Sequence, residues 1–143
     1  MLNLQLTDTK TFMAKLLKAS AFDDLLLSSM EILSFASFDI KQKKEDLYWR
    51  DIRPFALDIV KKGGTPKSIK LVFSLDKEKA SALKADTNFF LNIYYTSGEA
   101  SSLIATSGTS MKTFSLDKSG DHLWEDWVSQ FFATHEIATE ELD

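Results

Sequence analysis

Residues 69–98 read IKLVFSLDKEKASALKADTNFFLNIYYTSG and set the pattern for the chain. Apolar residues alternate with other residues over 69–75, which predicts a strand with at least one apolar face. Asp76 then caps a short helix that runs to about Lys84, and a second alternation over 89–95 predicts another strand. A strand, a helix and a further strand in succession favour a mixed α and β architecture.

The same order of elements occurs earlier in the chain. Residues 4–19 read LQLTDTKTFMAKLLKA and residues 71–85 read LVFSLDKEKASALKA, so an apolar strand, a Thr/Ser-and-Asp cap and a closing Leu-Lys-Ala recur. Two or three hairpin-linked strands follow in each case, which gives a weak internal repeat over residues 2–42 and 68–116. In the second copy, a turn at residues 107–109 is expected to separate two short strands. We therefore predict an α+β fold with a mostly antiparallel sheet.

Three longer segments have the spacing of amphipathic helices. They cover residues 9–18, 49–62 and about 121–135, each with apolar residues recurring three or four positions apart. Gly63, Gly64 and Pro66 end the second of them. We expect residues 1–143 to form a single domain with a flexible acidic tail at 139–143.

The composition excludes several classes of site. The chain has 143 residues, a net charge of -4 and no cysteine, which removes disulfides, thiolate zinc sites and cysteine nucleophiles. The N-terminus does not have the pattern of a signal peptide, and no apolar run reaches the ~18 residues of a membrane span. We therefore expect a cytoplasmic protein with no membrane partner.

The repeat has a topological resemblance to a known fold. Two βαβββ units with both helices on one side are similar to one domain of the sliding DNA clamps, whose helices carry lysine and arginine towards duplex phosphates. The helices at 49–62 and 121–135 depart from that pattern, and a ring would need two or more copies. The resemblance implies phosphate contacts by Lys10, Lys15, Lys18, Lys77 and Lys84.

Several motifs resemble an uncharacterised family of domains of unknown function from Firmicutes. They are TDTKTFMAKLL (7–17), WRDIRPF (49–55), TPKSIKLVF (65–73) and SGTSMKTFSLDKS (107–119), with Trp124 beyond them. The resemblance covers nearly the whole chain. It implies a bacterial cytoplasmic protein of about this length and carries no activity, ligand or catalytic residue.

Few residues suggest chemistry. A helix would place His122 near Glu125 and Asp126, which could serve as metal ligands or as a hydrolase site. A solvated helix face is the simpler explanation of this cluster. No motif for a cofactor or a catalytic serine is present, so we predict no metal, no cofactor and no catalytic residue.

A second group of residues suggests contact with an anion or a partner. Gly63 and Gly64 close a helix, whereas a phosphate-binding glycine loop opens one. The basic residues around them, and the only two arginines of the chain, could still contact an anion or a protein, with solvation of a helix end as the simpler explanation. These residues are Arg50, Arg53, Lys61, Lys62 and Lys67.

Together these observations favour a non-enzymatic interaction or scaffold domain. Its partner would be a protein, including a second copy of the chain. Nucleic acid is the alternative partner, which the net charge does not support. The alternatives are a clamp-like protein associated with DNA and a hydrolase centred on His122.

Overall fold

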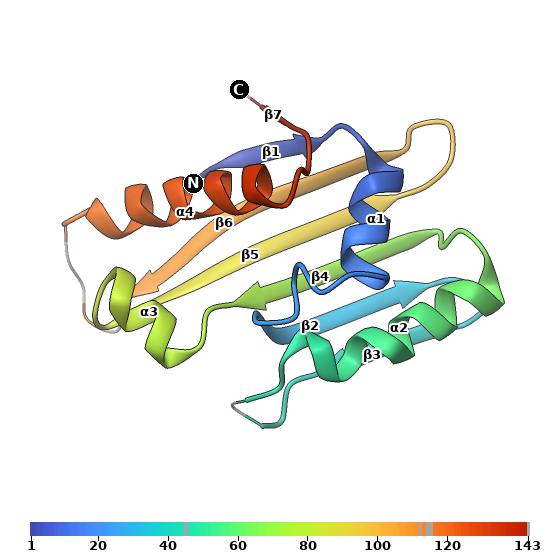
Figure 1. The fold of residues 1–143 in the computed structure, drawn as a ribbon, viewed down its shortest axis with the longest axis horizontal. Coiled ribbons are helices and arrows are strands. Elements are labelled where there is room, and N and C mark those ends of the chain that lie inside the picture. Colours follow the sequence, from blue (N-terminus) through green and yellow to red (C-terminus); the bar gives the residue numbers. More distant parts are fainter. Residues whose placement is uncertain (45, 112, 114–115, 143) are drawn as a thin grey trace.

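Within residues 1–44, 46–111, 113 and 116–142, which the computed structural model describes, seven strands form one antiparallel sheet (Figure 1). Their order across the sheet is β3 (Ser37–Lys41), β2 (Leu26–Leu33), β4 (Ser68–Ser74), β5 (Thr87–Thr96), β6 (Ser102–Met111), β1 (Asn3–Leu6) and β7 (Thr139–Glu141).

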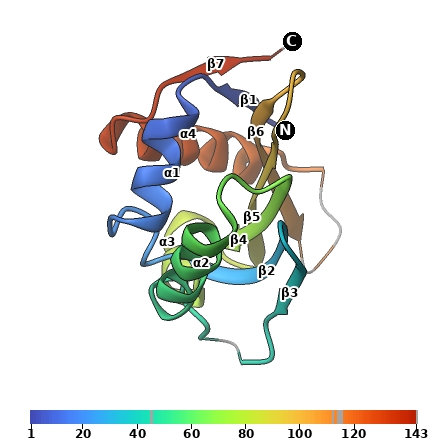
Figure 2. The ribbon, with the colours of Figure 1, turned by 90° about the vertical axis from the view of Figure 1, so that its right-hand side faces the viewer.

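The helices all lie against the same face of this sheet. They are α1 (Thr9–Leu17), α2 (Trp49–Gly63), α3 (Lys77–Leu83) and α4 (Ser119–Thr134), and Figure 2 shows them on one side of the strands. Alternate strand residues point towards the helices and are buried, as in β5, where Phe89, Leu91 and Ile93 are at most 2% exposed. The core therefore fills a single layer between helices and sheet, and the predicted α+β class is confirmed.

The other face of the sheet is open and mostly polar. One row across it contains Glu31, Lys70, Tyr94, Ile104 and Gln5, which lie opposite one another in successive strand pairs. The Lys70 ammonium lies 5.2 Å from the centre of the Tyr94 ring, a cation–π contact.

Helix starts follow the sequence signals. Asp8 caps α1 by accepting a hydrogen bond from the Thr11 N–H at 3.1 Å, and Asp76 caps α3 by accepting from the Lys79 N–H at 2.9 Å. At the end of α2, Gly64 adopts a positive φ of 71°, a conformation that favours glycine. Among the described residues, no helix has the length and apolar character needed to cross a bilayer.

In the described ranges the internal repeat takes the form β1-α1-β2-β3 and β4-α3-β5-β6, with two strands after α1 and two after α3. The clamp-like arrangement, which needs three strands there, is not confirmed. The predicted turn at residues 107–109 is wrong, because β6 is continuous and pairs with β5 from Ser102 to Met111. Of the strand expected over 110–116, residues 112, 114 and 115 lie outside the described part. Residues 139–141, expected to be flexible, form β7, which pairs with β1.

Candidate functional site

A groove with a volume of about 670 Å³ lies between α1 and the second half of α2. Figure 1 shows how α1 crosses the sheet. The two helices form its walls, and β4 and β5 form its floor. Its lining residues are Thr9, Lys10, Met13, Ala14, Leu17 and Lys18 from α1, Leu57, Val60 and Lys61 from α2, Gly64, Thr65 and Pro66 after α2, Ile69 from β4 and Tyr95 from β5.

A buried hydrogen bond joins the two walls. The indole N–H of Trp49, at the start of α2, donates to the Leu16 carbonyl in the last turn of α1 at 2.8 Å. Trp49 is 1% exposed and packs edge-on against Phe73. Carbonyls in the last turn of a helix have no partner within the helix, so this bond satisfies one of them and fixes α1 against α2.

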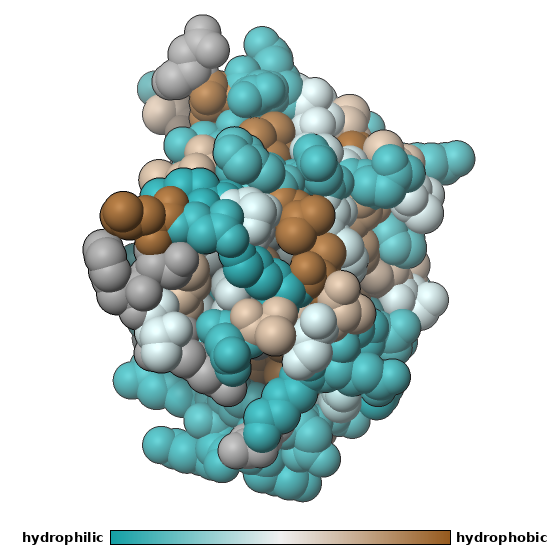
Figure 3. Space-filling view, turned by 90° about the vertical axis from the view of Figure 1, so that its left-hand side faces the viewer, coloured by the Kyte–Doolittle hydropathy of each residue, from teal (hydrophilic) through white to brown (hydrophobic). Residues whose placement is uncertain are grey.

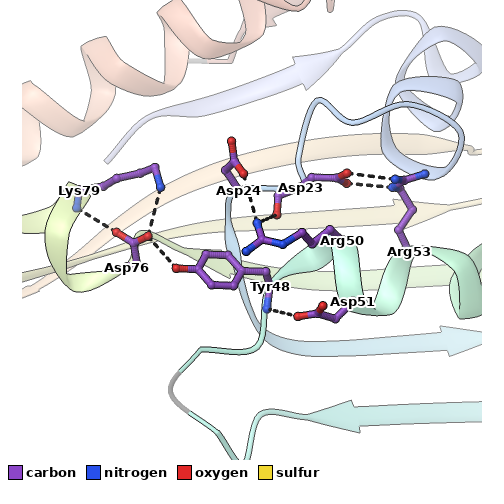
Figure 4. A network of polar contacts seen from close by, with 8 residues as sticks. All are labelled: Asp23, Asp24, Tyr48, Arg50, Asp51, Arg53, Asp76 and Lys79. Carbon is purple, nitrogen blue, oxygen red and sulfur yellow. Dashed lines mark hydrogen bonds and ion pairs between the residues drawn. The ribbon is translucent and has the colours of Figure 1, made fainter.

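Both arginines contact acidic residues of the segment between α1 and β2 (Figure 4). Arg53 donates two hydrogen bonds to the Asp23 carboxylate, at 2.8 and 3.0 Å, and both side chains are largely buried. Arg50 donates to the Asp24 carboxylate at 3.2 Å, and its guanidinium carbon lies 4.2 Å from the centre of the Tyr48 ring. These arginines therefore tie α2 to the chain that follows α1.

A second set of contacts, also in Figure 4, joins α3 to the start of α2. Tyr48 donates to Asp76 at 2.9 Å, and the Lys79 ammonium donates to the same carboxylate at 3.1 Å. The hydrogen bond to Asp76 raises the pKa of Tyr48. Burial alone would raise the pKa of Asp76, but the hydrogen bonds from Lys79 and Tyr48 outweigh it and lower that pKa.

The groove combines an apolar interior with a basic rim. Leu17 and Ile69, at 5% and 4% exposure, contribute to its deep apolar surface. Lys10, Lys18 and Lys61 are exposed at its edges, and the lining includes no carboxylate. In the described part of the chain, none of these three lysines has a carboxylate within ion-pairing distance.

One polar group lies on the floor of the groove. Tyr95 is only 7% exposed, yet its hydroxyl has no hydrogen-bond partner among the described residues. This hydroxyl is not among the fully enclosed polar atoms, and Tyr95 is one of the residues that line the groove. Buried tyrosine hydroxyls usually find a partner, and a bound molecule could supply one here.

The structure brings together only some of the residues singled out from the sequence. Lys10, Lys18 and Lys61 meet at the groove, whereas the other basic residues of α1, α2 and the following loop do not line it. The latter are Lys15, Arg50, Arg53, Lys62 and Lys67.

The lysines of the second repeat lie elsewhere. Lys77 and Lys84 are at the ends of α3, towards the opposite end of the helical layer from α1 (Figure 1). Lys84 donates to Asp117 at 2.6 Å and to Ser119 at 2.8 Å. Figure 3 shows this end of the molecule, where hydrophilic side chains dominate and apolar ones form small separate areas. The five lysines implied by the clamp resemblance therefore do not form one continuous basic surface.

His122 gains no support as a catalytic residue. Its side chain is exposed on α4 and does not line the neighbouring polar hollow of about 300 Å³, which contains Asp121 and Glu125. Asp121 there accepts a hydrogen bond from Thr109. Within the described residues, no group of three or more His, Asp or Glu side chains is arranged to hold a metal ion.

Sequence reasoning missed the apolar half of the groove and its tyrosine. Met13, Leu57 and Ile69 recur at the spacing of core residues. Residues that line an apolar groove recur at the same spacing, so the sequence pattern alone does not distinguish the two. The available signal was Tyr95, because it places a hydroxyl at the last core-facing position of an otherwise apolar alternation.

Comparison with known proteins gives a family without an activity. The chain matches no curated protein and no solved structure. A family model does match, over residues 41–140, which include the α2 wall and the floor of the groove and begin after α1. The chain therefore belongs to the family of unknown function DUF5721.

Proposed function

We propose that this protein is a non-enzymatic binding domain whose groove between α1 and α2 holds an amphipathic anion. The apolar body of the ligand would lie against Leu17, Leu57 and Ile69. Its carboxylate or phosphate would lie beside the lysines of the rim. The observation that carries the proposal is that one groove combines apolar walls, three lysines and Tyr95, whose hydroxyl has no hydrogen-bond partner within the described part of the chain.

The size and lining of the groove support a small molecule. Ligand sites have volumes of about 300–1,000 Å³ and apolar walls with a few polar groups that fix orientation, and about 670 Å³ falls within this range. Lysine ammonium groups attract anions and repel cations. The Tyr95 hydroxyl can donate to an anionic head or accept from a hydroxyl next to it.

Titration calorimetry with two probes of equal chain length tests the proposal. Dodecanoate should bind with one site per chain, and dodecyltrimethylammonium, which has the same tail and the opposite charge, should bind much more weakly. Equal binding of the two probes would mean that only apolar contact acts and would contradict the proposed role of the lysines. No saturable binding of dodecanoate would contradict the proposal as a whole.

Charge reversals locate the binding site. A pair of charges about 4 Å apart is worth about 1 kcal/mol in water, so Lys18→Glu or Lys61→Glu should weaken dodecanoate binding by about 2 kcal/mol, roughly thirtyfold. Lys15→Glu and Lys62→Glu are matched controls, because they make the same change on the same two helices outside the groove. Equal losses in both sets would indicate an effect of net charge and would contradict the site.

The Tyr95 hydroxyl can be tested separately. Tyr95→Phe keeps the ring and removes only the hydroxyl, so the fold should be retained while dodecanoate binding weakens by about 1 kcal/mol, the worth of one hydrogen bond. Unchanged binding would show that the hydroxyl does not contact the ligand.

A further inference from the structure

A separate surface lies at the β3 edge of the sheet. Among the described residues β3 pairs only with β2, and beside it a hollow of about 390 Å³ opens between β3 and α2. Phe35 and Phe55 in its lining are 61% and 62% exposed, and clustered exposed apolar residues mark sites of protein contact. The other lining residues are Phe38, Asp58, Ile59 and Lys62.

The backbone of β3 is available for pairing on its outer side. The Gln42 N–H donates to the Ser28 carbonyl of the neighbouring chain segment at 3.0 Å. In an antiparallel pair such bonds alternate, so Ile40 and Phe38 also direct their backbone groups towards β2. The N–H and C=O groups of Ser37, Asp39 and Lys41 therefore point to the free edge, where another strand can pair with them.

We infer that this edge pairs with β3 of a second copy of the chain, in an antiparallel register centred on Ile40. That register places Asp39 of each copy directly opposite Lys41 of the other. The N–H and C=O groups of Asp39 and Lys41 point to the free edge, so these two residues can form the backbone hydrogen bonds of this register. The two nearest alternatives, centred on Asp39 or on Lys41, would place like charges opposite each other, which is unfavourable.

The surroundings of Asp39 strengthen the charge argument. Asp39 lies opposite Glu31 of β2 on the open face, so two carboxylates already face each other there. In the described part of the chain Asp39 has no cation within ion-pairing distance. The partner's Lys41 would supply that cation.

The same pairing covers apolar surface. A two-fold axis normal to the sheet keeps the helices of both copies on one side and places Ile40 against its symmetry mate on that side. The partner chain then passes Phe38 and the edge of the hollow between β3 and α2. The opposite edge of the sheet is less suited to pairing, because β7 has only three residues and two of them are Glu140 and Glu141.

Sedimentation equilibrium of the full chain, with two charge reversals, tests the inference. The wild type should form a dimer. Asp39→Lys and Lys41→Asp should each raise the dimer dissociation constant by on the order of tenfold or more, because each creates two like-charge pairs. Mixing the two variants should restore association, because every cross-strand pair then joins a lysine to an aspartate.

Each outcome supports or overturns the inference. A wild type that stays monomeric overturns the inference. The β3 edge would then pair with a strand of a different protein or remain unpaired. A dimer that tolerates both reversals, or two weakened variants that fail to associate when mixed, also overturns it. Phe55→Ser is a second probe outside the strand and should weaken the dimer as well. All three positions are exposed, so the fold should be retained, which circular dichroism checks.

Discussion

Trp49→Phe should destabilise the protein through the bond between the two helices that wall the groove. The Leu16 carbonyl would lose the indole donor that now lies 2.8 Å away, and a buried acceptor without its partner costs about 1–3 kcal/mol. The smaller ring also leaves a void, at about 24 cal/mol per Å³, which adds about 1 kcal/mol. Urea denaturation followed by far-UV circular dichroism should therefore show a loss of about 2–4 kcal/mol.

A matched substitution separates the hydrogen bond from the loss of ring size. Trp127 is half-buried, and its indole N–H has no hydrogen-bond partner among the described residues. Its ring stacks on Trp124 and Phe131 at 5.0 and 5.2 Å, a contact that phenylalanine can retain. Trp127→Phe should therefore cost about 1 kcal/mol or less. If Trp49→Phe costs no more than this control, the bond to Leu16 does not hold the helices together.

Two further predictions concern stability and ionisation. Gly63→Ala should destabilise the fold by about 1 kcal/mol or more, because the new Cβ would lie 2.3 Å from Ser34 Oγ; Gly108→Ala, with its nearest atom at 3.8 Å, is the control for urea denaturation. The Lys84 hydrogen bond, together with those from Ser119, lowers the pKa of Asp117 to about 2. Lys84→Met should raise it towards 3.8, as NMR titration of the carboxyl carbon can measure. Because the folded-state pKa is the lower one, this stabilisation is present above pH 3.8 and disappears as the pH falls towards 2. An unchanged Asp117 midpoint in Lys84→Met would exclude the lysine as the cause.

Local patterns predicted most of the fold. The alternation over 69–75 and 89–95 corresponds to β4 and β5, and Asp76 caps α3 as its position suggested. The failures occurred where pairing between distant segments decides the structure. Residues 107–109 have the composition of a turn, but they stay extended because ten residues of β5 pair with β6 throughout. β7 likewise forms because it pairs with the side of β1 that does not face β6. No local sequence pattern reveals that this side is available.

The sequence predicted some residues of the candidate site but not that they lie together. Lys10, Lys18 and Lys61 were singled out from the sequence, but as parts of two unrelated hypotheses. They meet because α1 crosses the sheet towards the end of α2, and that crossing depends on Trp49 and Arg53 contacting the chain around α1. The spacing of apolar residues along a helix gives the direction of its buried face and does not show whether a neighbouring helix leaves a hollow there.

The place of β1 in the sheet has a consequence for synthesis of the chain. β1 lies between β6 and β7, which come much later in the sequence, since Leu4 pairs with both Ala105 and Glu141. On the ribosome, its leucines emerge long before either partner exists, and contacts between residues far apart in sequence form slowly. Protease digestion of stalled nascent chains should therefore find the N-terminus cleavable until residues 102–141 have left the exit tunnel, and early protection would argue against this order of events.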